Sequence, residues 1–243
     1  MKEAIEFYQN NCNYKFLWPE IPQNLVDNIE IAKWIFNQNI PFIDLDLTFN
    51  VSKWQKESCT AKNFYVPHRE SQPHKGWKSC CLHGIDIDKT GVWQCYKNDE
   101  PEYRWTSLAN YTPNIKNFWL NFPFEKYARI RFMNLESGGW INPHNDTPPD
   151  IGNNFDIVNN LIPVNIAIYH PDECFMTLKD FGTIPWTTGD IKIINIMNDH
   201  SVINFNSQSR IHLIAHGWVG NKIVEFSDLI VRSYKKQYEC YKV

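Results

Sequence analysis

The second half of the chain is a series of short apolar segments separated by turn residues, and this pattern limits the fold more than any other feature. The segments alternate or run apolar as β-strands do, and the breaks between them include KDFG, TTGD and NSQS. Many short strands at such spacing are typical of an antiparallel sandwich or barrel. The expected strands cover 127–135, 161–171, 174–178, 191–197, 200–205 and 210–218, and GGWINPHND (138–146) follows the first of them after a Gly-Gly turn.

The first half of the chain has a mixed pattern. Apolar residues at helical spacing predict an amphipathic helix over 24–37, with Pro22 near its start. A Thr-Pro opening predicts a second helix over 112–121. Alternation with a period of two predicts a strand over 41–49, and residues 76–88 can hold another strand.

These elements predict one domain that spans residues 1–243, since a chain of this length can bury a single large core. In it, a helical and mixed part (1–125) packs on a β core (126–220). The expected fold class is mainly β with flanking helices.

The overall composition is that of an ordinary folded protein, with 43% hydrophobic residues and a formal net charge of -3. This balance does not favour a nucleic-acid partner, because nucleic-acid-binding domains usually carry a basic excess. No apolar run is long enough for a transmembrane helix, and the N-terminal residues lack the apolar core of a signal peptide. The 7 cysteines are irregularly spaced, which favours a reducing, cytoplasmic location. The oligomeric state is left open.

The segment His144-Asn145-Asp146 carries the first chemical pattern. Residues i and i+2 of a strand point to one face, so an imidazole and a carboxylate would lie side by side and offer two ligands to a divalent metal. His200 opens a later β segment and can supply a third ligand. Two histidines and one carboxylate form the ligand set of non-haem Fe(II) oxygenases. Taken alone, the His-x-Asp pair also fits a chance occurrence, and His200 also fits a structural histidine at a strand end.

Arg210 lies ten residues after His200, in the apolar segment RIHLIAHGW. A buried guanidinium needs a carboxylate partner, because an unpaired buried charge is costly and the planar fork of arginine matches a carboxylate. One interpretation is an internal salt bridge. The other is a cosubstrate that carries a carboxylate.

Together these residues resemble the Fe(II)/2-oxoglutarate-dependent dioxygenases, and more narrowly the aspartyl/asparaginyl β-hydroxylase family. The narrower resemblance is carried by HKGWKSCCLHG (74–84), GGWINPHND (138–146), NIAIYHP (165–171), the run 184–204 and SRIHLIAHG (209–217). It is most evident in the second half of the chain.

The resemblance implies a double-stranded β-helix, of the jelly-roll or cupin-like kind, with one Fe(II) at its open end. It implies that His144, Asp146 and His200 are the metal ligands and catalytic residues, and that Arg210 binds the distal carboxylate of 2-oxoglutarate. Dioxygen (O2) would be the second cosubstrate. Vertebrate-type members lack the carboxylate ligand and work in the secretory pathway, so the presence of Asp146 is a departure from them.

Further residues are candidates for the same site. The resemblance places a polar residue near the cosubstrate at Asn165, and His212 would share the face of Arg210. Trp140 and Trp186 fit either a wall of the site or the core. Arg129 and Arg131 can either bind a substrate carboxylate or face solvent. The spacing of His68, His74 and His83 fits no standard metal site. The 74–77 segment is a candidate loop on the substrate side, and the 147–160 loop is a candidate lid.

The predicted function is hydroxylation of an amino-acid side chain, in a free amino acid or a peptide, with release of succinate and CO2. The alternatives are a cupin-type metal-binding protein without oxygenase activity and an oxygenase that acts on another small molecule or on nucleic acid. Arg210 separates the first alternative from the prediction, because a cupin without oxygenase chemistry needs no arginine for a carboxylate there.

Overall fold

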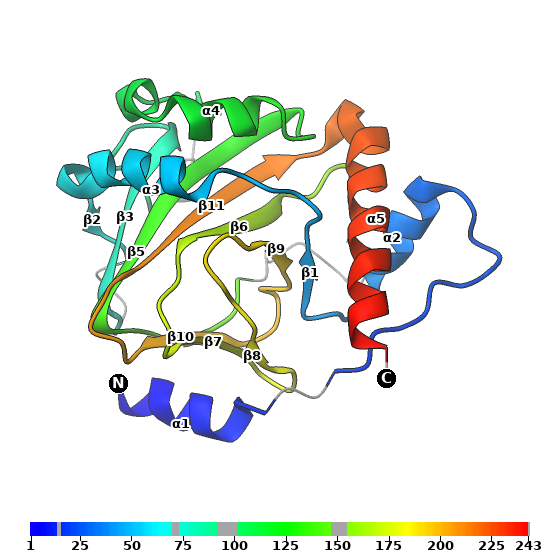
Figure 1. The fold of residues 1–243 in the computed structure, drawn as a ribbon, viewed down its shortest axis with the longest axis horizontal. Helices are drawn as coiled ribbons and strands as arrows, with labels where there is room; N and C mark the ends of the chain where they lie inside the picture. Colours follow the sequence, from blue (N-terminus) through cyan, green and yellow to red (C-terminus); the bar gives the residue numbers. More distant parts are fainter. Residues whose placement is uncertain (14–15, 70–72, 92–101, 147–154, 243) are drawn as a thin grey trace.

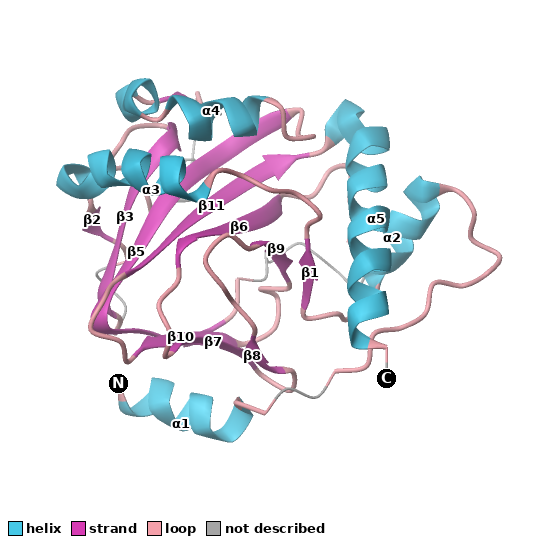
Figure 2. Ribbon diagram, viewed as in Figure 1, coloured by secondary structure: helices cyan, strands magenta, loops and turns pink. Residues whose placement is uncertain are grey.

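The computed structural model describes residues 1–13, 16–69, 73–91, 102–146 and 155–242. Its strands form one continuous antiparallel sheet that folds over into two opposed layers (Figures 1 and 2). The path through the sheet is β1 (Phe42–Asp44), β9 (Ile191–Ile194), β6 (Ile162–Tyr169), β11 (Arg210–Trp218), β5 (Lys126–His144), β10 (His200–Asn204), β7 (Cys174–Leu178) and β8 (Gly182–Ile184). On the other edge of β5 lies β3 (Lys75–Gly84), which also pairs with β2 (Val66–Pro67) and β4 (Arg104–Trp105).

The long strand β5 belongs to both layers. Its first part, up to Leu135, pairs with β11, and its last part, from Trp140 to His144, pairs with β10. Gly138 between the two parts has a φ of 63°, and a Cβ at Gly139 would lie 2.8 Å from the carbonyl oxygen of Lys75. The two glycines therefore let one strand bend from one layer into the other. The Gly-Gly turn expected from the sequence is in fact this bend, and the separation into two strands was wrong.

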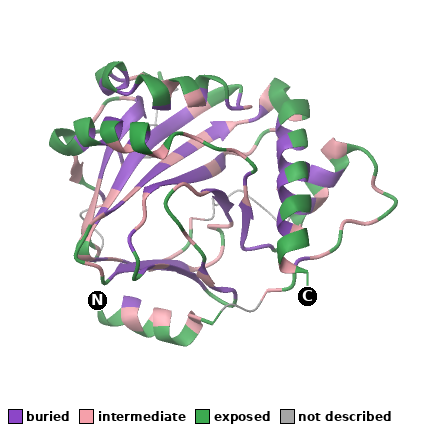
Figure 3. Ribbon diagram, viewed as in Figure 1, coloured by how far each residue is buried: buried purple, intermediate pink, exposed green. Residues whose placement is uncertain are grey.

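Helices cover the outer faces of the sheet. In Figure 1, α3 and α4 lie above the larger layer, α5 and α2 stand at its right edge, and α1 lies below the smaller layer. Figure 3 shows the strands largely buried and α1 largely exposed. The helices are α1 (Lys2–Asn11), α2 (Asn28–Asn37), α3 (Val51–Cys59), α4 (Pro113–Leu120) and α5 (Ile223–Tyr241), with short 3-10 helices η1 (Thr60–Phe64), η3 (Ser107–Tyr111) and η4 (Gly220–Lys222).

Both predicted helices are present, but their first residues differ from the predicted ones. The first begins at Asn28 rather than residue 24, because the Asp27 side chain accepts hydrogen bonds from two N–H groups of its first turn. The second begins at Pro113, but the side chain of its N-cap residue Thr112 makes no capping hydrogen bond. The buried carboxylate of Glu57, from α3, accepts the backbone N–H groups of Asn114 and Ile115 at 2.9 and 3.0 Å.

The predicted fold class is confirmed: the chain is mainly β with flanking helices and forms a double-stranded β-helix of the jelly-roll, cupin-like kind. The division into a mixed part (1–125) and a β core (126–220) stays a prediction, although β1 and β3 of the first part join the same sheet. Among the described residues, every helix is too short or too polar to cross a bilayer.

Strand β11 depends on a close approach at Gly217. A Cβ at this position would overlap the ring of Phe124, at 2.7 Å from its Cγ. That ring is itself packed against Phe122 and Phe226, with centroids 4.7 and 5.6 Å away. We expect Gly217→Ala to reduce the free energy of unfolding by about 1–3 kcal/mol, which would lower the Tm in calorimetry by roughly 2–12 °C.

The matched control for this substitution is Gly91→Ala. No described atom lies within 4 Å of a Cβ at Gly91, and its φ is not in the left-handed region. Its effect on unfolding should stay within about 0.5 kcal/mol. Equal losses in the two variants would contradict the close packing of Phe124 on β11.

Candidate active site

A cavity of about 810 Å³ is lined by side chains from both layers of the sheet. Its walls come mainly from β5, β6, β10 and β11, together with residues that follow or precede these strands. The structure brings together the six residues that the sequence predicts for the site, because all of them line this one cavity: His144, Asp146, Asn165, His200, Arg210 and His212.

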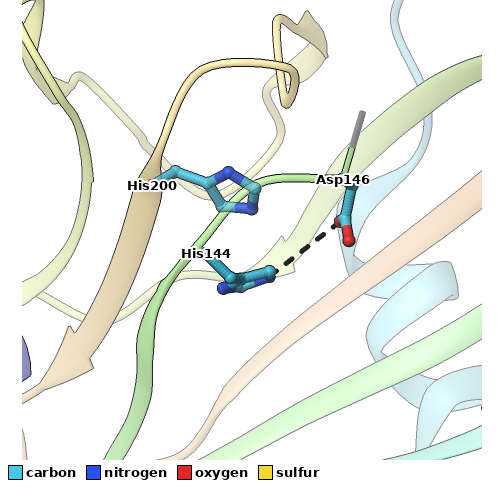
Figure 4. A group of neighbouring side chains, drawn as sticks. All are labelled: His144, Asp146 and His200. Atoms are coloured by element: carbon cyan, nitrogen blue, oxygen red, sulfur yellow. Dashed lines mark ion pairs between the residues drawn. The ribbon is translucent and has the colours of Figure 1, made fainter. Parts of the chain in front are cut away.

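The three predicted metal ligands lie next to one another (Figure 4). His144 and His200 are register partners across β5 and β10, and their ring centroids are 4.3 Å apart. The Nε2 atom of His144 is 4.0 Å from Oδ2 of Asp146. Each of the three residues offers a ligand atom within 4.8 Å of the other two. Over the described ranges, no other group of three histidine, cysteine or acidic side chains comes together in this way.

The route by which Asp146 reaches His144 differs from the expected one. Alternation along a strand does not place it, because β5 ends at His144. Instead, the backbone N–H of Asp146 donates to the carbonyl of Ile196 at 3.0 Å, in the segment that leads to β10. The loop contact therefore fixes the carboxylate beside the two imidazoles.

Both imidazoles are oriented by backbone carbonyls. Nδ1 of His144 lies 2.8 Å from the carbonyl of Asn142, and Nδ1 of His200 lies 3.0 Å from the carbonyl of Asn198. A carbonyl can only accept, so Nδ1 donates in each ring, and Nε2 is the ring atom left to bind a metal. Burial, helped by the neighbouring His144, lowers the pKa of His200 to about 4, so that its ring is neutral as a ligand requires.

Asp146 is held by an arginine that the sequence analysis did not identify. Nη2 of Arg69 lies 3.2 Å from Oδ1 of Asp146. Burial acts to raise the pKa of this carboxyl, but the neighbouring His200, Arg69 and His144 outweigh it and the pKa falls below its usual value. The carboxylate is therefore ionised at neutral pH. With two imidazoles and one carboxylate, the donor set fits a divalent ion such as Fe(II).

Arg210 is buried, with 4% of its surface exposed, and it faces the same cavity. Its Nε and Nη1 atoms have no hydrogen-bond partner among the described residues. Burial lowers its pKa, and the nearby Cys174 opposes that shift. No acid of the described chain forms an ion pair with it, so the interpretation as an internal salt bridge gains no support there. A guanidinium in this state fits a carboxylate ligand in the cavity.

His212 lies beside Arg210 in a chain of polar contacts. Nε2 of His170 lies 2.8 Å from the carbonyl of Cys174, and its Nδ1 lies 3.0 Å from Nε2 of His212. Because the carbonyl must accept, His170 uses Nδ1 as the acceptor and His212 carries its proton on Nε2. Burial and the charge of Arg210 keep the pKa of His212 well below its usual value. The ring is therefore neutral, and Asn165 lines the cavity further along, opposite Ile214.

Two arginines of β5 also enter the cavity. Arg129 and Arg131 are both buried and both line it, so the interpretation that they face solvent was wrong. The reason is that alternate residues of this part of β5 point into the cavity between the two layers of the sheet, where they are enclosed.

Of the two candidate tryptophans, neither lines the cavity, and Trp186 packs against the hydrophobic core, which was one of its two interpretations. Trp140 does not line the cavity: it is half-buried and its indole N–H donates to the carbonyl of Pro73 at 3.2 Å. Trp186 packs on the ring of His212, with centroids 4.6 Å apart, without lining the cavity. The segment 74–77, predicted as a loop on the substrate side, is instead the beginning of strand β3 from Lys75 on, and its Trp77 lines the cavity.

The remaining histidine candidates belong to no group of three metal-ligating side chains within the described chain. His68 hydrogen-bonds through Nδ1 to the hydroxyls of Ser79 and Thr90, and His74 accepts the backbone N–H of Asn142. Of the candidate lid, residues 147–154 lie outside the described residues, while Phe155, Asn159 and Asn160 line the cavity.

Sequence reasoning missed Arg69 and His170. His170 stands in NIAIYHP, one of the segments that carry the family resemblance, so its position was a usable signal. Arg69 had no such signal, because 77 residues separate it from Asp146 and only the folded chain brings them together.

Several solved structures are similar to this chain. One is an oxidoreductase of the 2OG-Fe(II) oxygenase family from Burkholderia pseudomallei, with 12% identity, a TM-score of 0.47, and coverage of 82% of this chain and 94% of that chain. Another is a prolyl hydroxylase from Trichoplax adhaerens in complex with a peptide of the hypoxia inducible factor oxygen degradation domain, with 10% identity, a TM-score of 0.46, and the same coverage. A prolyl-4-hydroxylase from Pseudomonas putida has 12% identity and a TM-score of 0.43, over 79% of this chain and 98% of that chain.

No curated protein matches the chain. The family model described as aspartyl/asparaginyl beta-hydroxylase matches residues 48–219, which is well over half of the sequence. This range contains the whole His144, Asp146 and His200 group as well as Arg210. The chain therefore belongs to the aspartyl/asparaginyl β-hydroxylase family of Fe(II)- and 2-oxoglutarate-dependent oxygenases.

Proposed function

We propose that this chain hydroxylates an amino-acid side chain, in a free amino acid or a peptide, with release of succinate and CO2. The observation that supports it best is the buried guanidinium of Arg210, which has unused donors and shares one cavity with the candidate metal ligands. A metal site alone would not need this arginine.

In this proposal His144, Asp146 and His200 hold Fe(II) through two Nε2 atoms and a carboxylate oxygen. The hydrogen bonds from Nδ1 to Asn142 and Asn198 keep both rings aimed at the metal. Arg69 holds the other oxygen of Asp146 and so fixes the direction of the carboxylate. When bound, Fe(II), 2-oxoglutarate and O2 supply the oxidising chemistry that converts a substrate C–H bond into C–OH.

Arg210 binds the distal carboxylate of 2-oxoglutarate in this proposal. His212 and Asn165 line the cavity with it and provide polar contacts for the same cosubstrate. The neutral state of His212 leaves its Nδ1 able to accept a hydrogen bond. Because these groups are buried, they bind and orient the cosubstrate away from bulk water.

The alternatives from the sequence analysis are a cupin-type metal protein without oxygenase activity and an oxygenase for another small molecule or nucleic acid. The mild negative net charge gives no support to a nucleic-acid partner. A cytoplasmic location also stays a proposal, supported by the six free cysteines of the described chain. The proposal commits to no oligomeric state.

The direct test is succinate release by the Fe(II)-loaded protein with 2-oxoglutarate, screened over free amino acids and short peptides. We expect release to rise when a substrate is present and a hydroxylated product to appear by mass spectrometry. Binding of metal and 2-oxoglutarate with no hydroxylated product from any amino acid or peptide would favour an oxygenase for a different substrate.

The metal ligands can be tested without turnover. His144→Ala and His200→Ala should each weaken Mn(II) binding by at least about 100-fold, because loss of a metal ligand costs more affinity than loss of a residue that only hydrogen-bonds to a ligand. Electron paramagnetic resonance measures the binding. The control is His83→Gln, because His83 is a buried histidine of β3 that does not line the cavity. Unchanged Mn(II) stoichiometry and affinity in both variants would contradict the proposal that these histidines are metal ligands.

Arg210→Ala tests the cosubstrate site. A charge-assisted hydrogen bond contributes about 1.5–3 kcal/mol, so loss of a bidentate pair should raise the Kd for 2-oxoglutarate by about 100-fold or more. Calorimetric titration of the Mn(II)-loaded protein measures this effect. Mn(II) binding should survive, and Arg210→Lys should restore only part of the affinity.

The control for that measurement is Arg232→Ala, in α5, whose side chain is half exposed and does not line the cavity. It should leave the Kd for 2-oxoglutarate unchanged. If Arg210→Ala lowers only the Tm and leaves cosubstrate affinity intact, Arg210 is structural and the cupin alternative becomes the better one.

A further inference from the structure

The strand pairing beside His144 contains an irregularity. In the pairing of β5 with β10, Ile141 lies opposite Val202 and His144 lies opposite His200. Three residue steps on β5 therefore match two steps on β10, so β5 carries one extra residue, which is a β-bulge. The pairing of β10 with β7 on its other side has no such shift. The bulge thus belongs to β5 and lies in the segment 142–143.

This bulge decides the face of the sheet to which His144 belongs. The side chains of a regular strand alternate between two faces. Ile141 lines the cavity, so regular alternation would direct residue 143 into the cavity and His144 to the outer face. One extra residue reverses this, and His144 lines the cavity while Asn142 and Pro143 do not. Without the bulge, the candidate ligand would point away from the cavity.

Two residues near the bulge suit an interrupted ladder. Pro143 has no N–H to leave unpaired, and proline within a sheet is largely confined to edges and bulges. The buried hydroxyl of Ser201 donates to the carbonyl of Ile141 at 2.8 Å, which satisfies an acceptor at the bulge. Such partners are needed because an unpaired polar group of the buried backbone is costly.

Asn142 holds the bulge by contacts in three directions. Its backbone N–H donates to Nδ1 of His74 at 3.0 Å, and its carbonyl accepts from Nδ1 of His144 at 2.8 Å. Its side-chain Nδ2 donates to Oε2 of Glu3 at 2.7 Å. The residue is 8% exposed, and its Oδ1 has no partner within the described chain. A buried amide with an unmet acceptor costs stability, so its presence here is explained better by what it positions than by packing.

Glu3 connects the bulge to the helix α1. In Figure 1 this helix lies below the smaller layer of the sheet, where it packs beside β10 and β5. Ala4, which is fully buried, and Tyr8, whose ring stacks on Phe175 at 4.9 Å, hold it there. The carboxylate of Glu3 is thereby brought to Asn142 across 139 positions of the sequence. A hydrogen bond to a carboxylate is stronger than one between neutral groups, so Glu3 fixes the amide of Asn142.

We infer that Asn142 and Glu3 are positioning residues for the metal site, because they hold from the outer face of the sheet the bulge that turns His144 into the cavity. The helix α1 then supports metal binding although it contributes no ligand. The inference rests on the proposed function, in which His144 is a ligand. Neither Asn142 nor Glu3 lines the cavity, so an effect of either on metal binding has to pass through the bulge.

Binding of Co(II) to protein prepared without metal measures this effect without turnover, because the visible absorption bands of Co(II) report the number and geometry of its ligands. Glu3→Ala should weaken Co(II) binding by about 10- to 100-fold, as loss of a residue that orients a metal ligand does, and should change the bands. Glu3→Gln keeps an oxygen that can accept from Asn142 and should restore most of the affinity. Glu6→Ala, which removes an exposed acid of the same helix that pairs with Lys2, is the matched control and should behave as the wild type.

A double-mutant cycle assigns the effect to the bond between the two residues. Asn142→Leu removes the amide, keeps a branched side chain, and should weaken Co(II) binding by a factor similar to that of Glu3→Ala. Two substitutions that break the same bond do not add, so the double variant should bind Co(II) about as tightly as either single variant. Unchanged affinity and bands in either single variant, or effects that multiply in the double variant, overturn the inference.

Two further measurements keep the outcomes separate. The Tm of each variant shows whether it is folded, and if Asn142→Leu is not, the comparison of Glu3→Ala with Glu3→Gln decides, because Glu3 is an exposed residue. Wild-type protein that binds Co(II) but, loaded with Fe(II), releases no succinate from 2-oxoglutarate would refute the proposed hydroxylation, while the variants would still decide the inference. Wild-type protein that binds no Co(II) would overturn both.

Discussion

The backbone pairing that sets His144 opposite His200 is the constraint on which the rest of the site depends. It exists because β5 runs through both layers of the sheet, bending at Gly138 and Gly139 instead of ending there. The first part of the same strand aligns β11, and with it Arg210, against the cavity. One continuous strand thus sets the positions of the candidate metal ligands and of the candidate cosubstrate residue.

Buried histidines and buried arginines of the cavity differ in charge. Burial keeps the pKa of His200 at about 4 and that of His212 well below its usual value, so both rings are neutral near pH 7. Arg131, by contrast, remains a cation at that pH even though burial lowers its pKa to about 9. The charge of Arg131 is consequently constant over the neutral range, while the imidazoles of His200 and His212 stay available as ligands or hydrogen-bonding groups.

How far the sequence predicted these features varies with how local each one is. Strands β7 and β11 have the predicted ends, because turn residues bound both segments. β1 ends at Asp44 instead of residue 49, since its partner β9 is only four residues long. The candidate metal ligands lie in local motifs that the sequence shows, but alternation could not tell which face of β5 is enclosed, so Arg131 had two interpretations. Contacts between distant segments, such as the capping of α4 by Glu57, leave no local pattern to detect.

The ion pair between Arg69 and Asp146 has a consequence for how a metal would be acquired. In many small metalloproteins the ligands repel or remain unsatisfied without the ion, so folding and metal uptake are one event. Here the carboxylate already has a cationic partner, and both imidazoles already have carbonyl partners. The chain can thus fold first and take up its metal afterwards, and the ion would stabilise the fold only by mass action, by an amount that rises with the logarithm of its free concentration.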